Sequence, residues 1–158
     1  MAARSGTPET PAEQLAELKL PARQEFIGLA KRVGASLGGM VGFSLEEIDE
    51  LSIAVAQACG SLIEAAEEMW GGAATLKLTY SSTTGGIAVD VETIAPTSED
   101  ALPAPAPALR GPRQRRAESV LQEALQREVI RLFVDDFRHH VDSGRRQMRY
   151  RMVKYLIS

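Results

Sequence analysis

One row of side chains in the sequence could bind a ligand or take part in chemistry: it consists of Gln57, Ser61 and Ala65, which are spaced four residues apart. Residues four positions apart share one face of a helix, so an amide, a hydroxyl and a methyl group would stand in line. A serine hydroxyl can serve as a ligand of Mg²⁺, whereas a glutamine amide cannot accept a proton at neutral pH and is no general base. The alternative is that Gln57 and Ser61 are ordinary polar residues on a half-buried helix face.

The element that must carry this row is a helix over residues 43–70. Ser44 and Glu47 have the spacing of a capping box, in which each side chain binds a free backbone N–H at the helix start. Gly71-Gly72 is expected to end the helix, because glycine adopts the left-handed conformation without a Cβ clash. An apolar stripe at three- and four-residue spacing predicts burial of one side: Ile48, Leu51, Val55, Ala58, Cys59, Leu62 and Ala66.

The other elements follow from periodicity and from turn residues. In chain order they are expected as a strand 15–20, a helix 22–37 ended by Gly38-Gly39, a hairpin of strands 75–80 and 87–92, a helix 117–134, and strands 137–141 and 145–157 joined by a turn at 142–144. This order predicts an α+β fold. We expect a two-layer sandwich whose mixed, mainly antiparallel sheet is covered on one face by about three helices.

Two segments lack a regular pattern. Residues 1–14 are polar and are expected to be a disordered leader before a single domain over 15–158. Residues 95–116 contain five of the eight prolines, which favours an extended linker. The alternative for this second segment is a docking or lid segment that becomes ordered on binding.

Composition and charge narrow the class of protein. The chain has 158 residues, of which 44% are hydrophobic and 25% charged, as in a soluble globular domain, and its single cysteine excludes an internal disulfide. No stretch resembles a signal peptide or a membrane span, so a cytoplasmic protein is expected. Residues 1–109 carry 6 Lys and Arg against 15 Asp and Glu, and residues 110–158 carry 12 against 6. The basic end could bind nucleic acid or an acidic protein, or could pair with the acidic half.

Three segments resemble the anti-sigma-factor serine kinases, which belong to the Bergerat-type (GHKL) superfamily of ATPases shared with histidine kinases. They are LKLPARQEF (18–26), FSLEEIDELSIAVAQAC (43–59) and FVDDFRHHVDSGRRQMRYRMVKYL (133–156). The second is the most specific, since it is similar to the family's "DLkiAVsEAC" helix. The resemblance implies the histidine-kinase-like ATPase fold, with 95–116 as a Pro/Arg-rich segment in place of the ATP lid.

The nucleotide signatures of that family are degenerate in this sequence. The resemblance places Gln57 where active members have a Glu base, and Ser61 where they have an Asn that binds Mg²⁺. Glu92 falls near the Asp that binds adenine, without the glycines that follow it in the family, and the lid glycines are absent as well. We therefore expect neither a catalytic residue nor a resident cofactor or metal; MgATP would bind only if the remnant Gln57, Ser61 and Glu92 still sufficed.

The sequence thus predicts a regulatory module of anti-sigma type that binds a sigma factor or an anti-anti-sigma protein without phosphoryl transfer, as a homodimer by resemblance. Its partner-binding residues are expected to be Arg110, Arg113, Arg115, Arg116 and Trp70, although the arginines could be a solvated charge run and Trp70 a cap on the core. The first alternative is an active serine/threonine kinase that phosphorylates an anti-anti-sigma protein. The second, less favoured, is a nucleic-acid-binding module using the basic C-terminal half, which would show a steep salt dependence.

Overall fold

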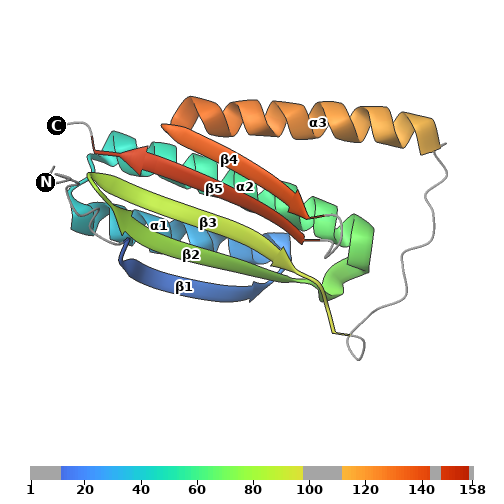
Figure 1. The fold of residues 1–158 in the computed structure, drawn as a ribbon, viewed down its shortest axis with the longest axis horizontal. Helices are drawn as coiled ribbons and strands as arrows, with labels where there is room; N and C mark the ends of the chain where they lie inside the picture. Colours follow the sequence, from blue (N-terminus) through green and yellow to red (C-terminus); the bar gives the residue numbers. More distant parts are fainter. Residues whose placement is uncertain (1–11, 98–111, 143–146, 157–158) are drawn as a thin grey trace, which may run out of the picture.

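A computed structural model describes residues 12–97, 112–142 and 147–156 of the chain. The elements are β1 (Gln14–Pro21), α1 (Ile27–Val41), α2 (Leu45–Trp70), β2 (Thr75–Thr83), β3 (Gly86–Ile94), α3 (Pro112–Phe133), β4 (Asp136–Asp142) and β5 (Gln147–Tyr155), with short 3-10 turns at Gln24–Phe26 and Gly71–Ala73. The strands form one sheet in the order β1-β2-β3-β5-β4, and each of these four pairings is antiparallel. The helices lie on one face of this sheet (Figure 1). The predicted α+β two-layer sandwich is confirmed.

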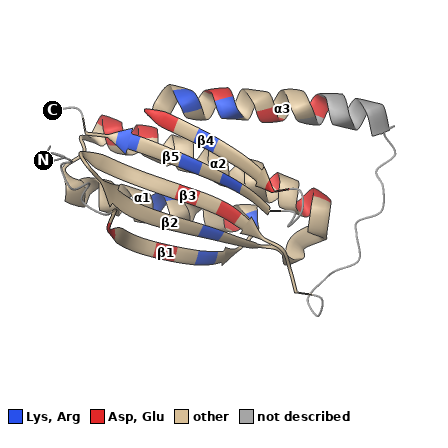
Figure 2. Ribbon diagram, viewed as in Figure 1, with Lys and Arg blue, Asp and Glu red and all other residues tan. Residues whose placement is uncertain are grey.

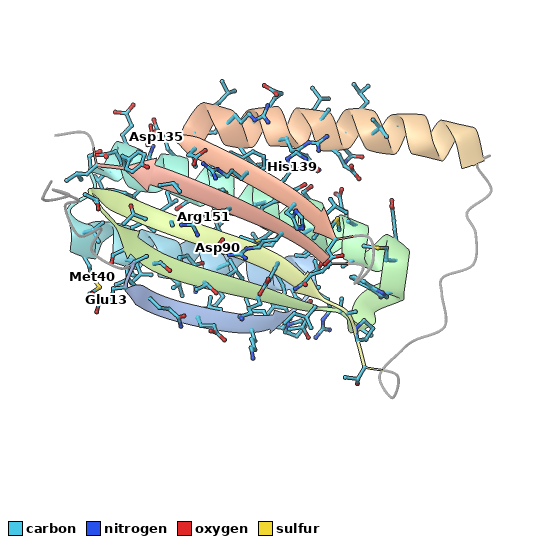
Figure 3. The ribbon with its side chains drawn as sticks, viewed as in Figure 1. Glu13, Met40, Asp90, Asp135, His139 and Arg151 are labelled. Carbon is cyan, nitrogen blue, oxygen red and sulfur yellow. The ribbon has the colours of Figure 1, made fainter. Side chains whose placement is uncertain are left out.

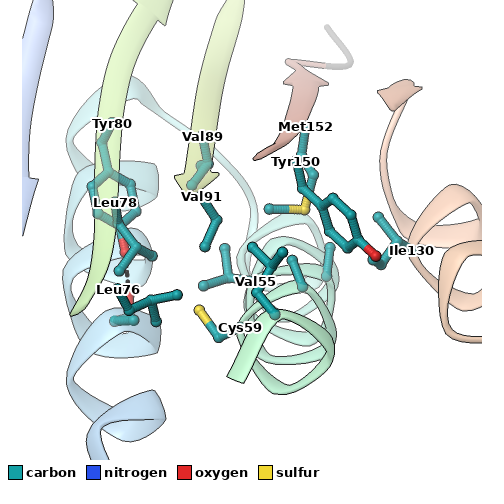
Figure 4. Packing of buried hydrophobic residues seen from close by; sticks show 14 of the residues in the cluster. Val55, Cys59, Leu76, Leu78, Tyr80, Val89, Val91, Ile130, Tyr150 and Met152 are labelled. Carbon is teal, nitrogen blue, oxygen red and sulfur yellow. Dashed lines mark hydrogen bonds between the residues drawn. The ribbon is translucent and has the colours of Figure 1, made fainter. Parts of the chain in front are cut away.

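The central helix forms as its sequence predicts. Ser44 accepts from the backbone N–H of Glu47, and the Glu47 carboxylate accepts from the backbone N–H of Ser44, so the capping box is complete. The apolar stripe of α2 is buried, apart from Ile48, which is partly buried against the core. It packs on inward side chains of β2, β3 and β5, including Leu78, Val91 and Met152 (Figure 4). Burial also raises the pKa of the Cys59 thiol to about 12, which keeps it protonated and unreactive.

Three predicted helix boundaries are wrong. The first helix begins at Ile27, after a 3-10 turn at Gln24–Phe26, and not at residue 22. The first helix does not end at Gly38-Gly39, because α1 continues to Val41 and ends at Gly42, whose φ of 95° favours glycine. Gly38 is instead a close-packing position: a Cβ there would meet the Phe43 side chain at 3.3 Å. The last helix begins at Pro112 rather than at 117, as suits a residue that has no N–H to pair at the helix start. Residues 112–116 therefore belong to α3 and not to a linker.

The sheet face opposite the helices carries paired charges (Figure 2). Arg149 donates through Nε and Nη2 to one oxygen of Asp90, at 3.2 and 2.8 Å, and Arg151 donates to the other oxygen at 2.8 Å. Arg149 and Arg151 point outward from β5, and Tyr150 and Met152 alternate with them toward the core, as predicted. Residues 1–11 of the predicted leader and residues 143–144 of the predicted turn lie outside the described residues. Within the described ranges, no helix has the length and apolar character needed to cross a bilayer.

Candidate functional site

Ser61 lies in the interior of the protein and its hydroxyl is already engaged. The residue is buried on α2, and its Oγ lies 3.2 Å from the hydroxyl of Tyr150, which reaches it from β5. Tyr150 is also buried (Figure 4), and its ring is edge-on to Phe137 at a centroid distance of 5.3 Å. A buried hydroxyl pair of this kind satisfies both polar groups. The position expected to face a nucleotide is therefore part of the helix–sheet packing.

The two other members of the row lie one turn to either side of Ser61. Gln57 is half-buried, and no hydrogen bond to its side chain occurs in the part of the chain that the structure describes. Ala65 is also half-buried and lines a cavity that Ser61 borders. The predicted row of Gln57, Ser61 and Ala65 along α2 thus exists. It offers one uncommitted amide, which can donate and accept hydrogen bonds but cannot act as a base.

The cavity beside this row lies between α2 and α3. It measures about 160 Å³, and its walls are Ser61, Ala65, Gln122 and the four glutamates Glu64, Glu68, Glu118 and Glu123. The helices run side by side here, and the Gln126 amide on α3 donates to Glu64 on α2 at 3.5 Å. None of these lining residues is a lysine or an arginine. The space between the two helices is consequently small and acidic.

MgATP does not fit this arrangement. Sites for drug-sized ligands usually measure about 300–1,000 Å³. The cavity of about 160 Å³ is smaller than this, and the groove of about 550 Å³ beside it is also lined by glutamates, so charge rather than size opposes the nucleotide. These glutamates would repel a polyphosphate, whereas phosphate sites supply backbone N–H groups, Lys or Arg. Ser61, which the resemblance places at the family's Mg²⁺-binding position, is hydrogen-bonded to Tyr150 instead. We therefore derive no phosphoryl-transfer step from this site.

The structure does not bring Glu92 together with Gln57 and Ser61. Glu92 lies on the sheet face opposite the helices, where its carboxylate is 3.5 Å from the Lys77 ammonium and accepts from the Gln147 amide at 3.3 Å. The neighbouring residue, Thr93, is fully buried, and its hydroxyl accepts from the Met148 backbone N–H at 3.4 Å. The carboxylate that could have received an adenine amino group thus belongs to the outer ion-pair network.

The residues expected to bind a partner are placed only in part. Arg110 lies outside the described residues, and Arg113, Arg115 and Arg116 fall in the first turns of α3, whose side chains there are not described. Trp70 ends α2 and is half-buried against the hydrophobic core. This position agrees with a tryptophan that covers the end of the core. The partner-binding role of all five residues stays a prediction.

His139 on β4 faces two cations from α3. Its Nε2 lies 3.2 Å from Arg127 Nη1, and its ring is 6.4 Å from that of Tyr150. The pKa of His139 is lowered by partial desolvation and by the positive charges of Arg127 and Arg131. A protonated imidazole would therefore weaken the contact between β4 and α3.

A pH titration of stability tests this contact. Because the folded state lowers the pKa of His139, the unfolded chain binds its proton first as the pH falls through about 6.5. Stability should then decline from pH 7 toward the folded pKa and level off below it. The His139→Gln variant should lose this component of the decline in urea unfolding measured between pH 5 and 8. An unchanged pH profile in the variant would rule out the contact as its source.

Sequence reasoning missed the side chains that close the site. The alternation on β5 does predict that Tyr150 points inward, but no local pattern pairs it with Ser61, 89 positions away. A signal for the acidic wall was present, since Glu64 and Glu68 continue along α2 at four-residue spacing. Glu118 and Gln122 have the same spacing on α3. Local patterns do not show that the pair on α2 and the pair on α3 line the same cavity.

The architecture is a two-layer α+β sandwich, which is consistent with the histidine-kinase-like ATPase fold. Searches of curated proteins find similarity to serine-protein kinases RsbW. The chain is 35% identical over 50 residues to the one from Bacillus pumilus, which is 32% of this chain and 31% of that protein. It is 29% identical over 55 residues to that of Halalkalibacterium halodurans (35% and 34%), and 28% over 48 residues to that of Bacillus thuringiensis (30% and 30%).

These matches confirm the resemblance to the anti-sigma-factor serine kinases that the sequence predicts. They span about a third of the length of the curated relatives and about a third of this chain. No protein-family model matches the sequence. The similarity therefore covers one part of the chain, and the activity of this chain has to be inferred from its own residues.

Proposed function

We propose that this protein is a regulator of anti-sigma type that acts by binding a sigma factor or an anti-anti-sigma protein, without phosphoryl transfer. The observation that carries the proposal is the acidic space beside the row of Gln57, Ser61 and Ala65. Ser61 is bonded to Tyr150, and four glutamates line a cavity of about 160 Å³. A site of this kind has lost the features with which a kinase holds MgATP. What it retains is the scaffold of a family whose members act on other proteins.

The degenerate row also lacks a group that could activate a substrate hydroxyl. Protein kinases place a carboxylate where it can accept that proton, and Gln57 has no such capacity. The four glutamates of the cavity do not substitute for it, since they surround the space where the phosphates themselves would have to lie. Binding without chemistry is the function that these side chains support best.

Titration calorimetry with MgATP tests the proposal. We expect no heat of binding up to millimolar ATP for the wild-type protein, and none for Gln57→Glu/Ser61→Asn, because restoring the two family residues leaves the glutamates and Tyr150 in place. Circular dichroism of the variant controls for folding. Co-purification with the sigma factors and anti-anti-sigma proteins of the same genome should then recover a stable complex in the absence of ATP.

The alternative function is an active serine/threonine kinase, and the similarity to serine-protein kinases favours it. It requires MgATP to enter between α2 and α3, and it predicts micromolar binding by the wild-type protein. Transfer of labelled phosphate from ATP to a co-purified anti-anti-sigma protein would establish it. Either result would overturn the binding-only proposal.

The proposal includes a homodimer, as the resemblance implies, and sedimentation velocity measures it directly. It does not include nucleic-acid binding. The outward arginines of β5 that could have contacted phosphates, Arg149 and Arg151, are held by the Asp90 carboxylate at 2.8 Å. A surface whose cations already have anionic partners gains little from a phosphate backbone.

A further inference from the structure

We propose that the outer side of α3 is a docking surface for a basic, amphipathic helix of a partner protein. This inference rests on the proposed function, which it deepens by naming the surface and the chemistry of the partner. The surface consists of a leucine row, Leu121, Leu125 and Leu132, and of a glutamate flank formed by Glu64, Glu67, Glu68 and Glu118.

The leucine row is exposed although leucine favours burial. The exposed fractions of Leu121, Leu125 and Leu132 are 64%, 59% and 78%. Their spacing of four and seven residues sets them on one side of the helix, whereas Ile130, on the opposite side, is fully buried. In Figure 1, α3 runs along the margin of the molecule above β4, and in Figure 3 side chains project from its outer side. An aligned row of exposed leucines is typical of a protein–protein contact rather than of scattered surface residues.

The glutamate flank lies directly beside this row. Glu118 precedes Leu121 by three positions and Gln122 precedes Leu125 by three, so each is a neighbour of its leucine on the helix surface. Glu118 and Gln122 also line the cavity that they share with Glu64 and Glu68 of α2. A wider groove of about 550 Å³ continues from there along Glu64, Glu67, Glu68, the two glycines after α2 and Gln122. Neither set of lining residues includes a lysine or an arginine.

The charge of the flank selects the partner. A helix that sets an apolar stripe on the leucine row brings its next row of side chains over the glutamates, where Lys or Arg would be attracted. The leucine spacing of four and seven residues matches the anchors that a helix in a groove presents.

The test uses two synthetic helical peptides of about 18 residues, or five turns. Both have leucine on one face; the first carries Lys and Arg on the other face and the second carries Glu there. Fluorescence anisotropy measures their binding to the full-length wild-type protein, to Leu121→Glu/Leu125→Glu, and to the control Leu45→Glu. Leu45 is 82% exposed and lies at the N-terminal end of α2, whereas the groove lies at the C-terminal end of that helix. Glutamate is favoured in the first turn of a helix, so this control substitution should not disturb folding.

We expect the basic peptide to bind the wild-type and Leu45→Glu proteins equally, and to bind Leu121→Glu/Leu125→Glu at least tenfold more weakly. A weaker affinity of the α3 variant for the basic peptide is diagnostic. If general attraction between opposite charges caused the binding, the two added glutamates would strengthen it instead. The acidic peptide should bind none of the three proteins. Equal or tighter binding of the basic peptide by the α3 variant, or no binding by the wild type, would refute the docking surface.

A self-association measurement separates the competing occupant. If sedimentation velocity shows a dimer that Leu121→Glu/Leu125→Glu converts to a monomer, a second copy covers the leucine row and the proposal is overturned. The MgATP titration described above is independent of these readouts. Failure of the docking surface with no ATP bound would leave the binding function in place, whereas micromolar ATP binding would remove that function whatever the peptides do.

Discussion

Replacing Glu50 with alanine is expected to lower the free energy of unfolding by about 3 kcal/mol, more than replacing its partner Lys154 with methionine. The Lys154 ammonium donates to the Glu50 carboxylate at 2.6 Å and to the backbone oxygen of Phe133 at 3.1 Å. The exposed fractions of the two side chains are 4% for Lys154 and 33% for Glu50. Loss of Glu50 therefore leaves a buried, unpaired cation, while loss of Lys154 leaves a carboxylate that water can reach.

Urea unfolding of four variants measures this asymmetry. Lys154→Met should cost about 1 kcal/mol, since methionine fills much of the same volume and the remaining anion is partly hydrated. The double variant Glu50→Ala/Lys154→Met should be more stable than Glu50→Ala alone, and the exposed Glu46→Ala serves as the surface control. Equal losses from Glu50→Ala and Lys154→Met would mean that the cation is not buried as described. The contact joins β5, the start of α2 and the end of α3, so it also positions the helix proposed to dock a partner.

The sequence predicts most of the fold because its elements carry clear local signals. The capping box at Ser44 specifies where α2 begins. The stripe of α2 and the alternation of the β2–β3 hairpin each specify a side to bury, and burial of those sides leads to one sandwich. One of the wrong boundaries arises where a local rule conflicts with a tertiary contact. Gly38 was expected to break α1, but it is kept inside the helix by close packing on Phe43.

For the candidate site, the sequence shows only that the residues with which the family binds MgATP are replaced. Periodicity shows which side of β5 faces inward, yet it does not show that Tyr150 meets Ser61 or that Lys154 meets Glu50. Those pairs depend on the insertion of β5 between β3 and β4, a long-range pairing with no local signal. Glu92 illustrates the same limit. Its position in the chain is near that of the family's adenine-binding residue, but a strand turns alternate side chains to opposite faces, and Glu92 points away from the helices.

Replacing Ser61 with asparagine, the residue that the active family uses to hold Mg²⁺, is expected to destabilise this protein by about 2 kcal/mol. Ser61 is buried and lies 3.2 Å from the Tyr150 hydroxyl, so a longer amide must displace the tyrosine or adopt a strained rotamer. Ser61→Ala and Tyr150→Phe should each cost only about 1 kcal/mol, the worth of one hydrogen bond.

Urea unfolding of these variants, with Ser36→Asn at an exposed position of α1 as the control for the lower helix propensity of asparagine, checks the steric explanation. If Ser61→Asn is as stable as the wild-type protein, the site has room for the family's ligand, and the case against nucleotide binding is left to the glutamates alone. A loss much larger than that of Ser61→Ala would mean that the nucleotide site was replaced by core packing. Reversal of one residue then cannot restore it, because Tyr150 and the acidic walls of α2 and α3 would have to change together.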